Sequence, residues 1–389
     1  MATNAINIRR FVDVTTSVQE TPTQIRRDWG AVLFVQKGTD GQTTALTKYN
    51  DLTSVIEGAG SNTEAAKFAT ALYNTSYRGV SLNSPIWVAV IGAADEEQFT
   101  TNFSALLGSE EYFYIALDSN FADSVKKTAA TLAGASETAH KLVLDDMSAN
   151  AFDLNLEDDL ALGADCSVSA FVKSNSFSSV AAVAINPSNT NKYYSASYIA
   201  FYATRTFTPT ATQMCSINAK PAQGVQPVDM TDSALSASVD IETRASNLVE
   251  KNASVYANIK LVGLVGWYGG KVGSGDELCD VVSADYLQYT VTMAVFNLLQ
   301  TTPRLAMNAN GASRLATVLS TCFDSLAAAG VIGGGVSMEG EIYPESGYKF
   351  SIPIPTGVAK ANGLWEGITC SALLIGQTRR VVILNDLVK

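Results

Sequence analysis

The chain has 389 residues, which is long enough for two or three domains that each enclose a substantial core. Apolar residues make up 47% of it and charged residues only 16%, so the composition is that of ordered globular protein and excludes a disordered tail. The formal net charge of −11 argues against nucleic acid as the main partner, because binding phosphates requires a cationic surface. The low charge density also fits a surface that other subunits largely cover.

The cysteine pattern and the length of the apolar segments indicate the cellular compartment in which we expect the protein. The five cysteines lie far apart and form no CxxC pair, so we expect reduced, buried thiols. The start of the chain, residues 1–4, has no apolar signal segment, and the longest apolar stretches, such as residues 261–268, are far too short to cross a bilayer. The sequence therefore predicts a protein that is made in a cytoplasm, stays soluble and makes no direct membrane insertion.

The front of the chain reads as a solitary β-strand. Apolar and polar residues alternate there with a period of two, on Ile6, Ile8, Arg10, Val12 and Val14. A strand with a free edge must be paired or covered, or it recruits another chain. We therefore expect residues 1–22 to form an extended N-terminal arm that adds to a sheet in a neighbouring subunit.

Residues 23–207 alternate between strand-like and helix-like segments, which predicts an outer layered α/β domain. Strands that are buried on both faces and separated by helices imply right-handed βαβ units around a mainly parallel sheet. The predicted strands are residues 29–36, 85–91, 112–117 and 140–144, and the predicted helices are residues 64–77, 95–107, 121–134 and 192–205.

The second half of the chain changes pattern. Residues 208–232 contain three prolines and a glycine, which indicates a connector. Residues 233–376 then predict an inner α+β domain, with long helices at 234–257, 284–300 and 311–329, an apolar strand and a glycine-rich turn at 261–270, and short β segments at 347–355 and 367–374. The predicted fold class is thus α/β, with an outer layered domain, an α+β C-terminal domain and two extended ends.

The last thirteen residues, 377–389, read as a second solitary strand. A short apolar run follows two arginines and ends before Asn385, with the order Arg379, Arg380, Val381, Val382, Ile383 and Leu384. We expect this strand to be exchanged between subunits, as the N-terminal arm is. The arginine pairs near the two chain ends are either solvated charges that prevent aggregation or partners of acidic patches on neighbouring subunits.

Motifs for catalysis are largely missing. The chain has one histidine, His140, which excludes histidine pairs, zinc triads and HExxH sites and is expected to be structural. No GxSxG elbow occurs. The glycine-rich stretch around Lys271 fails as a phosphate loop, because Val265 and Val272 stand where Gly and Ser or Thr are needed. We predict no catalytic residue, no metal and no cofactor.

An enzyme remains the first alternative. An α/β domain that binds a nucleotide or a sugar would need polar side chains at the C-terminal ends of its strands. Candidates are Asp118 and the pair Asp145 and Asp146, together with the backbone at Gly92 and Ala93. No recognisable phosphate loop accompanies them.

The order of features in the last half of the chain resembles a contractile phage tail sheath protein of the short-chain myovirus type. No single element is a strict motif, and the resemblance lies in their shared order. The elements are Ala184-Ile185-Asn186-Pro187-Ser188 before a helix with Tyr193, Tyr194, Tyr198 and Tyr202, then Lys220-Pro221-Ala222-Gln223-Gly224-Val225, residues 247–252, Val255-Tyr256-Ala257, Gly263, Gly269-Gly270, residues 286–299 and Gly311.

The resemblance implies a structural subunit, without enzymatic activity, in a virion. Such subunits form hexameric rings that stack helically around a tail tube protein, and the sheath ends at baseplate and tail terminator proteins. The C-terminal domain would face the tube, where Arg304 and Arg314 are the candidate contacts. Assembly would take place in the host cytoplasm, and contraction would drive the tube through the host envelope. The sheath of a phage-like bacteriocin or of a bacterial injection device is the second alternative.

Overall fold

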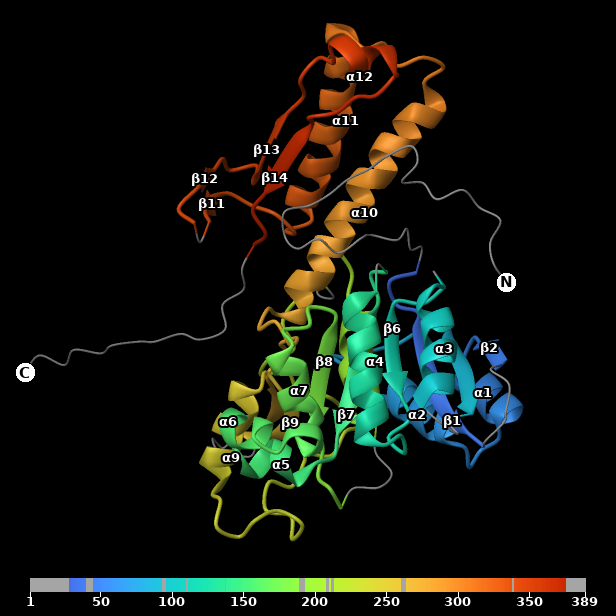
Figure 1. The fold of residues 1–389 in the computed structure, drawn as a ribbon, viewed down its shortest axis with the longest axis vertical. Helices are drawn as coiled ribbons and strands as arrows, with labels where there is room; N and C mark the ends of the chain where they lie inside the picture. The colour runs from blue at the N-terminus through green and yellow to red at the C-terminus, as the bar shows by residue number, and fades with distance from the viewer. Residues whose placement is uncertain are drawn as a thin grey trace, which may run out of the picture.

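The protein is described by a computed structural model that covers residues 28–375, except residues 40–44, 93–95, 110, 137, 189–192, 208–209, 211–212, 260–263 and 338. An α/β body carries a smaller, elongated lobe that is built on two long helices (Figure 1). The predicted N-terminal arm and the predicted C-terminal strand both lie outside the described residues.

The body is built around a six-stranded sheet with the order β2-β5-β1-β6-β7-β8. All neighbouring strands pair in parallel except β2, which runs antiparallel to β5 at the edge. This confirms the predicted, mainly parallel sheet. The strands are β1 Val32–Gly38, β2 Ala45–Tyr49, β5 Ile86–Gly92, β6 Tyr114–Leu117, β7 Lys141–Asp146 and β8 Val180–Ala184.

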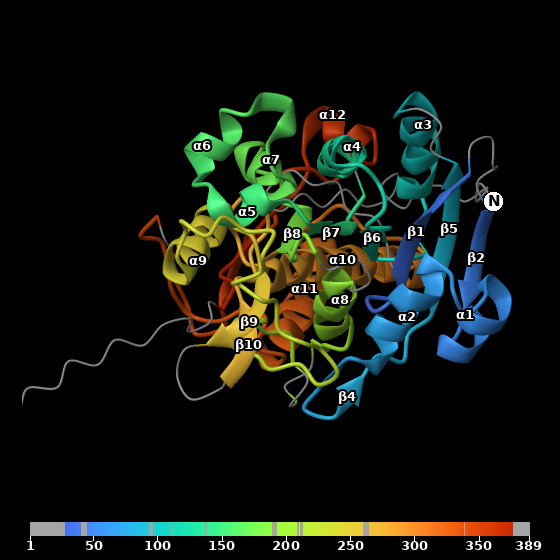
Figure 2. The same ribbon diagram turned by 90° about the horizontal axis from the view of Figure 1, so that it is seen from below.

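Helices cover both faces of this sheet, as a parallel sheet requires (Figure 2). One face packs against α2 Glu64–Asn74 and α8 Tyr194–Ala203, and α1 Leu52–Ala59 lies beside α2. The opposite face packs against α3 Glu96–Leu107, α4 Asp123–Ala135 and α7 Val168–Ser174. Four of these helices, α2, α3, α4 and α8, confirm predicted helices, whereas α1 and α7 were not predicted as helices.

The helix predicted at residues 234–257 is wrong. Helix α9 spans only Ile241–Glu250, and the chain then turns into β9 Val255–Ile259, which pairs antiparallel with β10 Leu264–Tyr268. Asn252 has a φ of 55°, a left-handed conformation that ends the helix and that asparagine tolerates. The segment after it is rich in residues that favour strands, and Tyr256 is buried there.

Residues between the predicted connector and the long helices pack against the body. Trp267 on β10 is fully buried, and its Nε1 donates to the Tyr77 hydroxyl at 2.7 Å. Ser254 forms a parallel bridge with Val183 of β8, so this segment extends the sheet edge. Tyr77 belongs to β3 Ser76–Tyr77, which forms a short hairpin with β4 Val80–Ser81. The first part of the predicted inner domain therefore lies in the body, and the domain boundaries stay a prediction.

The lobe is carried by α10 Leu278–Thr301 and α11 Ala309–Ala328, which confirm the predicted helices at 284–300 and 311–329. These two helices pack side by side (Figure 1). The rest of the lobe consists of β11 Gly335–Val336, β12 Ile342–Tyr343, β13 Tyr348–Ser351, α12 Gly357–Ala361 and β14 Thr369–Ala372. None of the helices in the described ranges is both long enough and apolar enough to cross a membrane.

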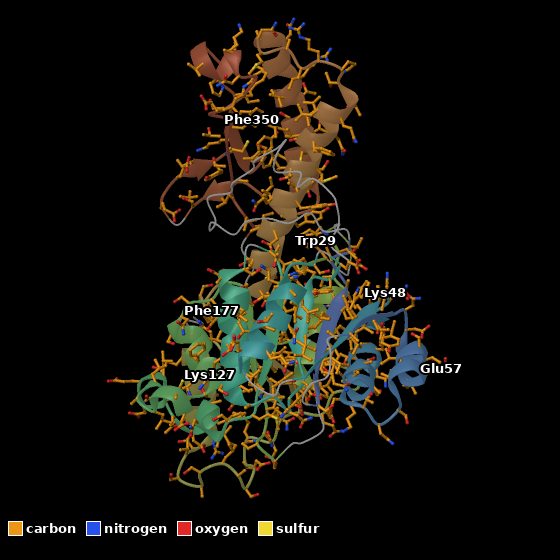
Figure 3. All side chains as sticks on the ribbon, turned by 45° about the vertical axis from the view of Figure 1, so that its right-hand side comes forward. Trp29, Lys48, Glu57, Lys127, Phe177 and Phe350 are labelled. Carbon is orange, nitrogen blue, oxygen red and sulfur yellow. The ribbon has the colours of Figure 1, made fainter. Side chains whose placement is uncertain are left out.

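Helix α10 is rooted in the body by a ring cluster and an ion pair. Lys141, the first residue of β7, places its Nζ 2.7 Å from the Asp285 carboxylate, and both side chains are largely buried. Trp29 lies where the lobe meets the body (Figure 3). Its ring makes edge contacts with four others at centroid distances of 4.8 to 5.8 Å, from Phe113, Phe207, Tyr286 and Tyr289.

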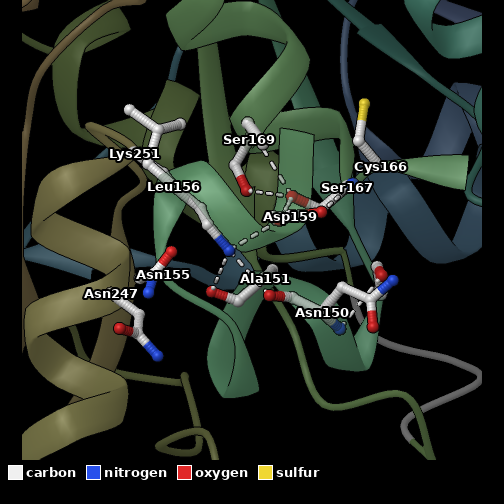
Figure 4. A network of polar contacts seen from close by, with 12 residues as sticks. Asn150, Ala151, Asn155, Leu156, Asp159, Cys166, Ser167, Ser169, Asn247 and Lys251 are labelled. Atoms are coloured by element: carbon white, nitrogen blue, oxygen red, sulfur yellow. Dashed lines mark hydrogen bonds and ion pairs between the residues drawn. The ribbon is translucent and has the colours of Figure 1, made fainter. Parts of the chain in front are cut away.

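A second buried ion pair fastens the far edge of the body (Figure 4). Lys251 Nζ lies 2.6 Å from Asp159 Oδ2, and neither side chain is exposed. The ammonium also donates to the carbonyl groups of Asn150 and Ala151, and the carboxylate accepts from the backbone and hydroxyl of Ser167. The network joins the end of α9 to α5 Ala149–Asp153, to α6 Leu156–Leu160 and to the start of α7. A 3-10 turn at Gly163–Asp165 follows α6.

Removing one partner of this pair should destabilise the body strongly. Lys251→Met would leave the Asp159 carboxylate buried without its cation, and we expect the free energy of unfolding to fall by about 3–5 kcal/mol. Urea denaturation monitored by circular dichroism measures this change. Lys349→Met is the matched control, because the Lys349–Glu341 pair is exposed and should contribute nothing measurable. Equal effects of the two variants would contradict the prediction.

Candidate assembly surface

The lobe contains a two-stranded sheet that rests on helix α11. Strands β13 and β14 pair antiparallel, with Tyr348 opposite Ala372 and Ser351 opposite Thr369. The Tyr348 ring stacks on Phe323 of α11 at 4.9 Å, and its hydroxyl donates to Asp324 at 2.8 Å. One face of the sheet is therefore covered. Two strands on their own are marginally stable, so packing on α11 supports this pair.

Both edges of this sheet carry unpaired backbone groups. The Leu373 N–H donates to the Gly347 carbonyl at 2.8 Å, which identifies that pair as hydrogen-bonded. Antiparallel pairs alternate between hydrogen-bonded and non-hydrogen-bonded residues, so Tyr348 and Ala372 turn their backbone groups outward. The same alternation turns Phe350 and Cys370 outward. Within the described ranges these four outward N–H groups donate to no acceptor, and each edge can therefore receive another strand.

Strand β13 begins beside a point where the backbones of Gly347 and Gly333 lie very close together. Residues 331–333 continue the line of β13 along the same side of β14, since Gly333 N–H donates to the Leu373 carbonyl. Gly347 has a φ of 78°, and a Cβ there would lie 2.4 Å from the nitrogen of Gly333. Only glycine satisfies both conditions. The outer edge of β14 faces away from this crossing.

Exposed apolar side chains are concentrated in the lobe. Among the described residues, the three most exposed large apolar side chains are Val358 at 76%, Ile342 at 72% and Val336 at 64%, and all three lie in the lobe. The lobe also exposes Leu299, Ile354, Leu364 and Ile375. Apolar surface gathered on one part of a molecule marks an interaction site.

The two candidate tube contacts lie at one end of the lobe. Arg304 stands in the connection between α10 and α11, and Arg314 stands near the start of α11. Both side chains are exposed. The structure brings them to the tip of the helical hairpin, away from the body (Figure 1). Their role as tube contacts stays a prediction.

The remaining predicted assembly residues lie outside the described part of the chain, and their exchange between subunits stays a prediction. They are Ile6, Ile8, Arg10, Val12, Val14, Arg379, Arg380, Val381, Val382, Ile383 and Leu384. The donor segments stay predictions. Sequence reasoning predicted the short β segments at 347–355 and 367–374, which form β13 and β14, but it did not predict the edges that are open among the described residues. No local sequence signal marks an open edge, because the edge is defined by the strands that do not pair with it.

The carboxylates proposed for an enzyme serve as helix caps. Asp145 accepts from the backbone N–H and the hydroxyl of Ser195 at the start of α8, at 2.8 and 2.6 Å. Asp146 does the same with Ser169 at the start of α7. Burial raises the pKa of both, that of Asp145 to about 7. The partial positive charge of a helix N-terminus favours a carboxylate at each position, and burial in the fold outweighs it and raises both pKa values.

The other chemistry-bearing residues are also engaged in the fold. Asp118 accepts from the backbone of Lys37 and Asn120. His140 is buried, with its Nε2 3.0 Å from the Leu107 carbonyl and its ring stacked on Tyr112. All five cysteines are free, three of them buried and two half-buried. The described residues contain no cluster of three side chains placed to hold a metal ion.

The fold is similar over nearly its whole length to chains of contractile injection systems. A chain of the 6-fold symmetrised anti-feeding prophage (AFP) baseplate has a TM-score of 0.58 at 13% identity, covering 97% of this chain and 98% of that one. A chain of the AFP baseplate in the contracted state has a TM-score of 0.59 at 12% identity, covering 100% and 98%. A chain of the PVC sheath complex of an extracellular contractile injection system, in the contracted state, has a TM-score of 0.54 at 12% identity and 96% coverage of both.

The amino-acid sequence matches no protein-family model and no curated protein. At 12 to 13% identity the structural similarity shows the fold, and at that level it confirms the resemblance to contractile tail sheath proteins.

Blocking the outer edge of β14 should stop assembly without unfolding the lobe. In Ala372→Pro the proline ring replaces an outward N–H and leaves the bonds between β13 and β14 intact. We expect a monomer that circular dichroism shows to be folded, and no cylinders in negative-stain electron microscopy. Ser371→Pro is the control, because it removes an inward N–H that bonds to β13 and should lower the melting temperature more than Ala372→Pro does. Normal cylinders from Ala372→Pro would show that this edge is not used.

The buried Asp145 carboxylate should make stability depend on pH. Its pKa is raised from an ordinary 3.8, so the folded protein holds this proton more tightly than the unfolded chain does, and stability falls as pH rises from about 4 to 7. Asp145→Asn should remove this contribution, at most about 1.4 kcal/mol per pH unit. Urea titrations at pH 5, 6 and 7 measure the slope. Asp240→Asn, at an exposed cap of α9, should leave the slope unchanged; an unchanged slope in Asp145→Asn would refute the assignment.

Proposed function

We propose that this protein is a structural subunit of a contractile tail sheath. One observation carries the proposal: among the described residues no strand pairs with the outer edge of β13 or of β14, in a chain whose fold follows components of contractile injection systems over nearly their full length. A free edge invites strand addition, and this chain has strand-like segments at both ends to donate. The role is structural, without enzymatic activity.

In this proposal the subunits form hexameric rings that stack helically around a tail tube. Residues 1–22 and 377–389 of each subunit add to β13–β14 sheets of neighbouring subunits and link the rings into a continuous mesh. Baseplate and tail terminator proteins close the two ends. The particle is a virion tail that is assembled in the host cytoplasm, and its contraction drives the tube through the host envelope.

Strand exchange suits a machine whose subunits rotate. Backbone hydrogen bonds along an added strand persist when the subunits move, because the connecting segments act as hinges, whereas a flat interface would separate. Burying Val381, Val382, Ile383 and Leu384 in a neighbour contributes roughly 6–12 kcal/mol as an upper estimate. Association and ordering remove part of this, and the rest holds the linkage during contraction.

The lobe is the tube-facing part of the subunit, and the α/β body projects outward. Arg304 and Arg314 support this orientation, because they expose two cations at the end of a helical hairpin that extends away from the body. In the predicted division, residues 23–207 form the outer domain, residues 208–232 the connector and residues 233–376 the inner domain.

The second candidate is the sheath of a bacterial injection device or a phage-like bacteriocin. The observation that favours it is the similarity to chains of the AFP baseplate and of the PVC sheath complex. Both candidates predict hollow striated cylinders of the purified protein, and neighbouring genes separate them. An enzyme that binds a nucleotide or a sugar predicts no cylinders but a higher melting temperature with its ligand.

Deleting residues 377–389 should leave a folded subunit that does not assemble. The core of the body and the bonds between β13 and β14 are made by described residues that the deletion keeps, so circular dichroism should show a folded subunit. Negative-stain electron microscopy should show no cylinders. Sheaths of normal length from the shortened chain would rule out the exchange of this strand.

A further inference from the structure

The outer edge of β14 lies directly before the segment proposed for exchange. The described chain continues from β14 to Ile375, whose N–H donates to Val331, on the side of β13. The outer side of β14 is left with the outward backbone groups of Cys370, Ala372 and Leu374. Only four residues, 376–379, separate Ile375 from Arg380 and the apolar run. A connection of that length is common in β-hairpins.

We propose that, in the unassembled subunit, residues 380–384 fold back on the outer edge of their own β14, and that assembly exchanges this strand for that of a neighbour. The inference rests on the proposed function, and it names what occupies the edge before a neighbour does. It makes the sheath a domain-swapped polymer, in which the same pairing closes the monomer and links the assembly.

The register follows from the four-residue connection. Arg380 then lies opposite Ile375, Val381 opposite Leu374 and Ile383 opposite Ala372. Leu374 and Ala372 belong to the partly buried side chains that pack toward the core of the lobe. Opposite residues of a hairpin share a face, so Val381 and Ile383 join that apolar layer, and Val382 points to the solvent side.

Charge complementarity supports the same fold-back. Asp280 of α10 lines a crevice of about 20 Å³ together with Leu374 and Ile375, at the point where the chain leaves β14. The proposed register returns Arg379 and Arg380 to this point. An arginine beside a half-buried carboxylate gains a charge-assisted hydrogen bond. The turn is thereby held at its base.

A disulfide pair tests the closed monomer. Leu373 and Val382 would form a non-hydrogen-bonded cross-strand pair, whose short Cα separation of about 4.5 Å suits a disulfide. The double variant Leu373→Cys with Val382→Cys is purified as a dilute monomer, oxidised with diamide, and analysed by non-reducing electrophoresis and mass spectrometry. We expect an intrachain link in at least about ten times the fraction found for the control, Leu373→Cys with Ile383→Cys, whose second cysteine faces the other side. No intrachain link in the monomer, or equal linking in the control, would overturn the proposal.

Hydrogen exchange of the unaltered protein provides a second measurement that needs no substitution. The amides of Cys370, Ala372 and Leu374 should exchange at least about tenfold more slowly in the full-length monomer than after deletion of residues 380–389, because the returning strand accepts from them. Equal exchange in the two chains would overturn the fold-back.

The oxidised cylinders separate this inference from the proposed function. There the Leu373–Val382 pair should link different chains. Interchain links without an intrachain link in the monomer would support strand exchange and overturn the closed monomer. An intrachain link in the monomer without cylinders would support the fold-back, and the proposed function would be the part that fails.

Discussion

The root of helix α10 determines where everything in the lobe lies. One helix leaves the body, and the Lys141–Asp285 ion pair and the rings around Trp29 set its direction. A buried ion pair tolerates little displacement, since a charge pulled from its partner stays desolvated. The ring cluster restricts rotation about the helix axis because the Trp29 ring contacts four others, two of them on α10. The edges of β13 and β14 are therefore presented at a fixed place relative to the body, from which α10 carries the chain into the lobe.

Much of the body could be predicted from the sequence, because the spacing of apolar residues indicates which side chains of a strand or helix are buried. The central strands are apolar runs between amphipathic helices, and these are the segments that were predicted. Strand β2 was missed because its side chains are exposed and its sequence is mixed, and β8 was missed because alanine gives little strand signal. Strand β9 was misread as helix. Its identity depends on contacts from far along the chain, such as the Tyr256 hydroxyl with the backbone of Ala222, and a local pattern cannot contain those.

The candidate surface was predictable only in part. Apolar alternation in residues 6–14 and the run at 381–384 identify segments that need a partner, because an isolated strand leaves its backbone unpaired. The acceptor could not be predicted, since an open edge is defined by what does not pair with it. That required the register of β13 against β14 and the bond from Leu373 to Gly347. Asp145 and Asp146 were candidate enzyme-site residues in the sequence, whereas in the structure they accept hydrogen bonds from the first turns of α8 and α7.

The length of α10 gives its root a mechanical meaning. Its 24 residues make a lever of about 36 Å at about 1.5 Å per residue. A tilt of about 10° at the base would carry the far end sideways by about 6 Å, which exceeds the spacing of about 4.8 Å between paired strands. A compliant base would thus displace the tip of the helical hairpin, between α10 and α11, by more than the spacing of two strands. The stiffness of the joint at Trp29 and Lys141 sets the tolerance with which one subunit can be aligned to the next.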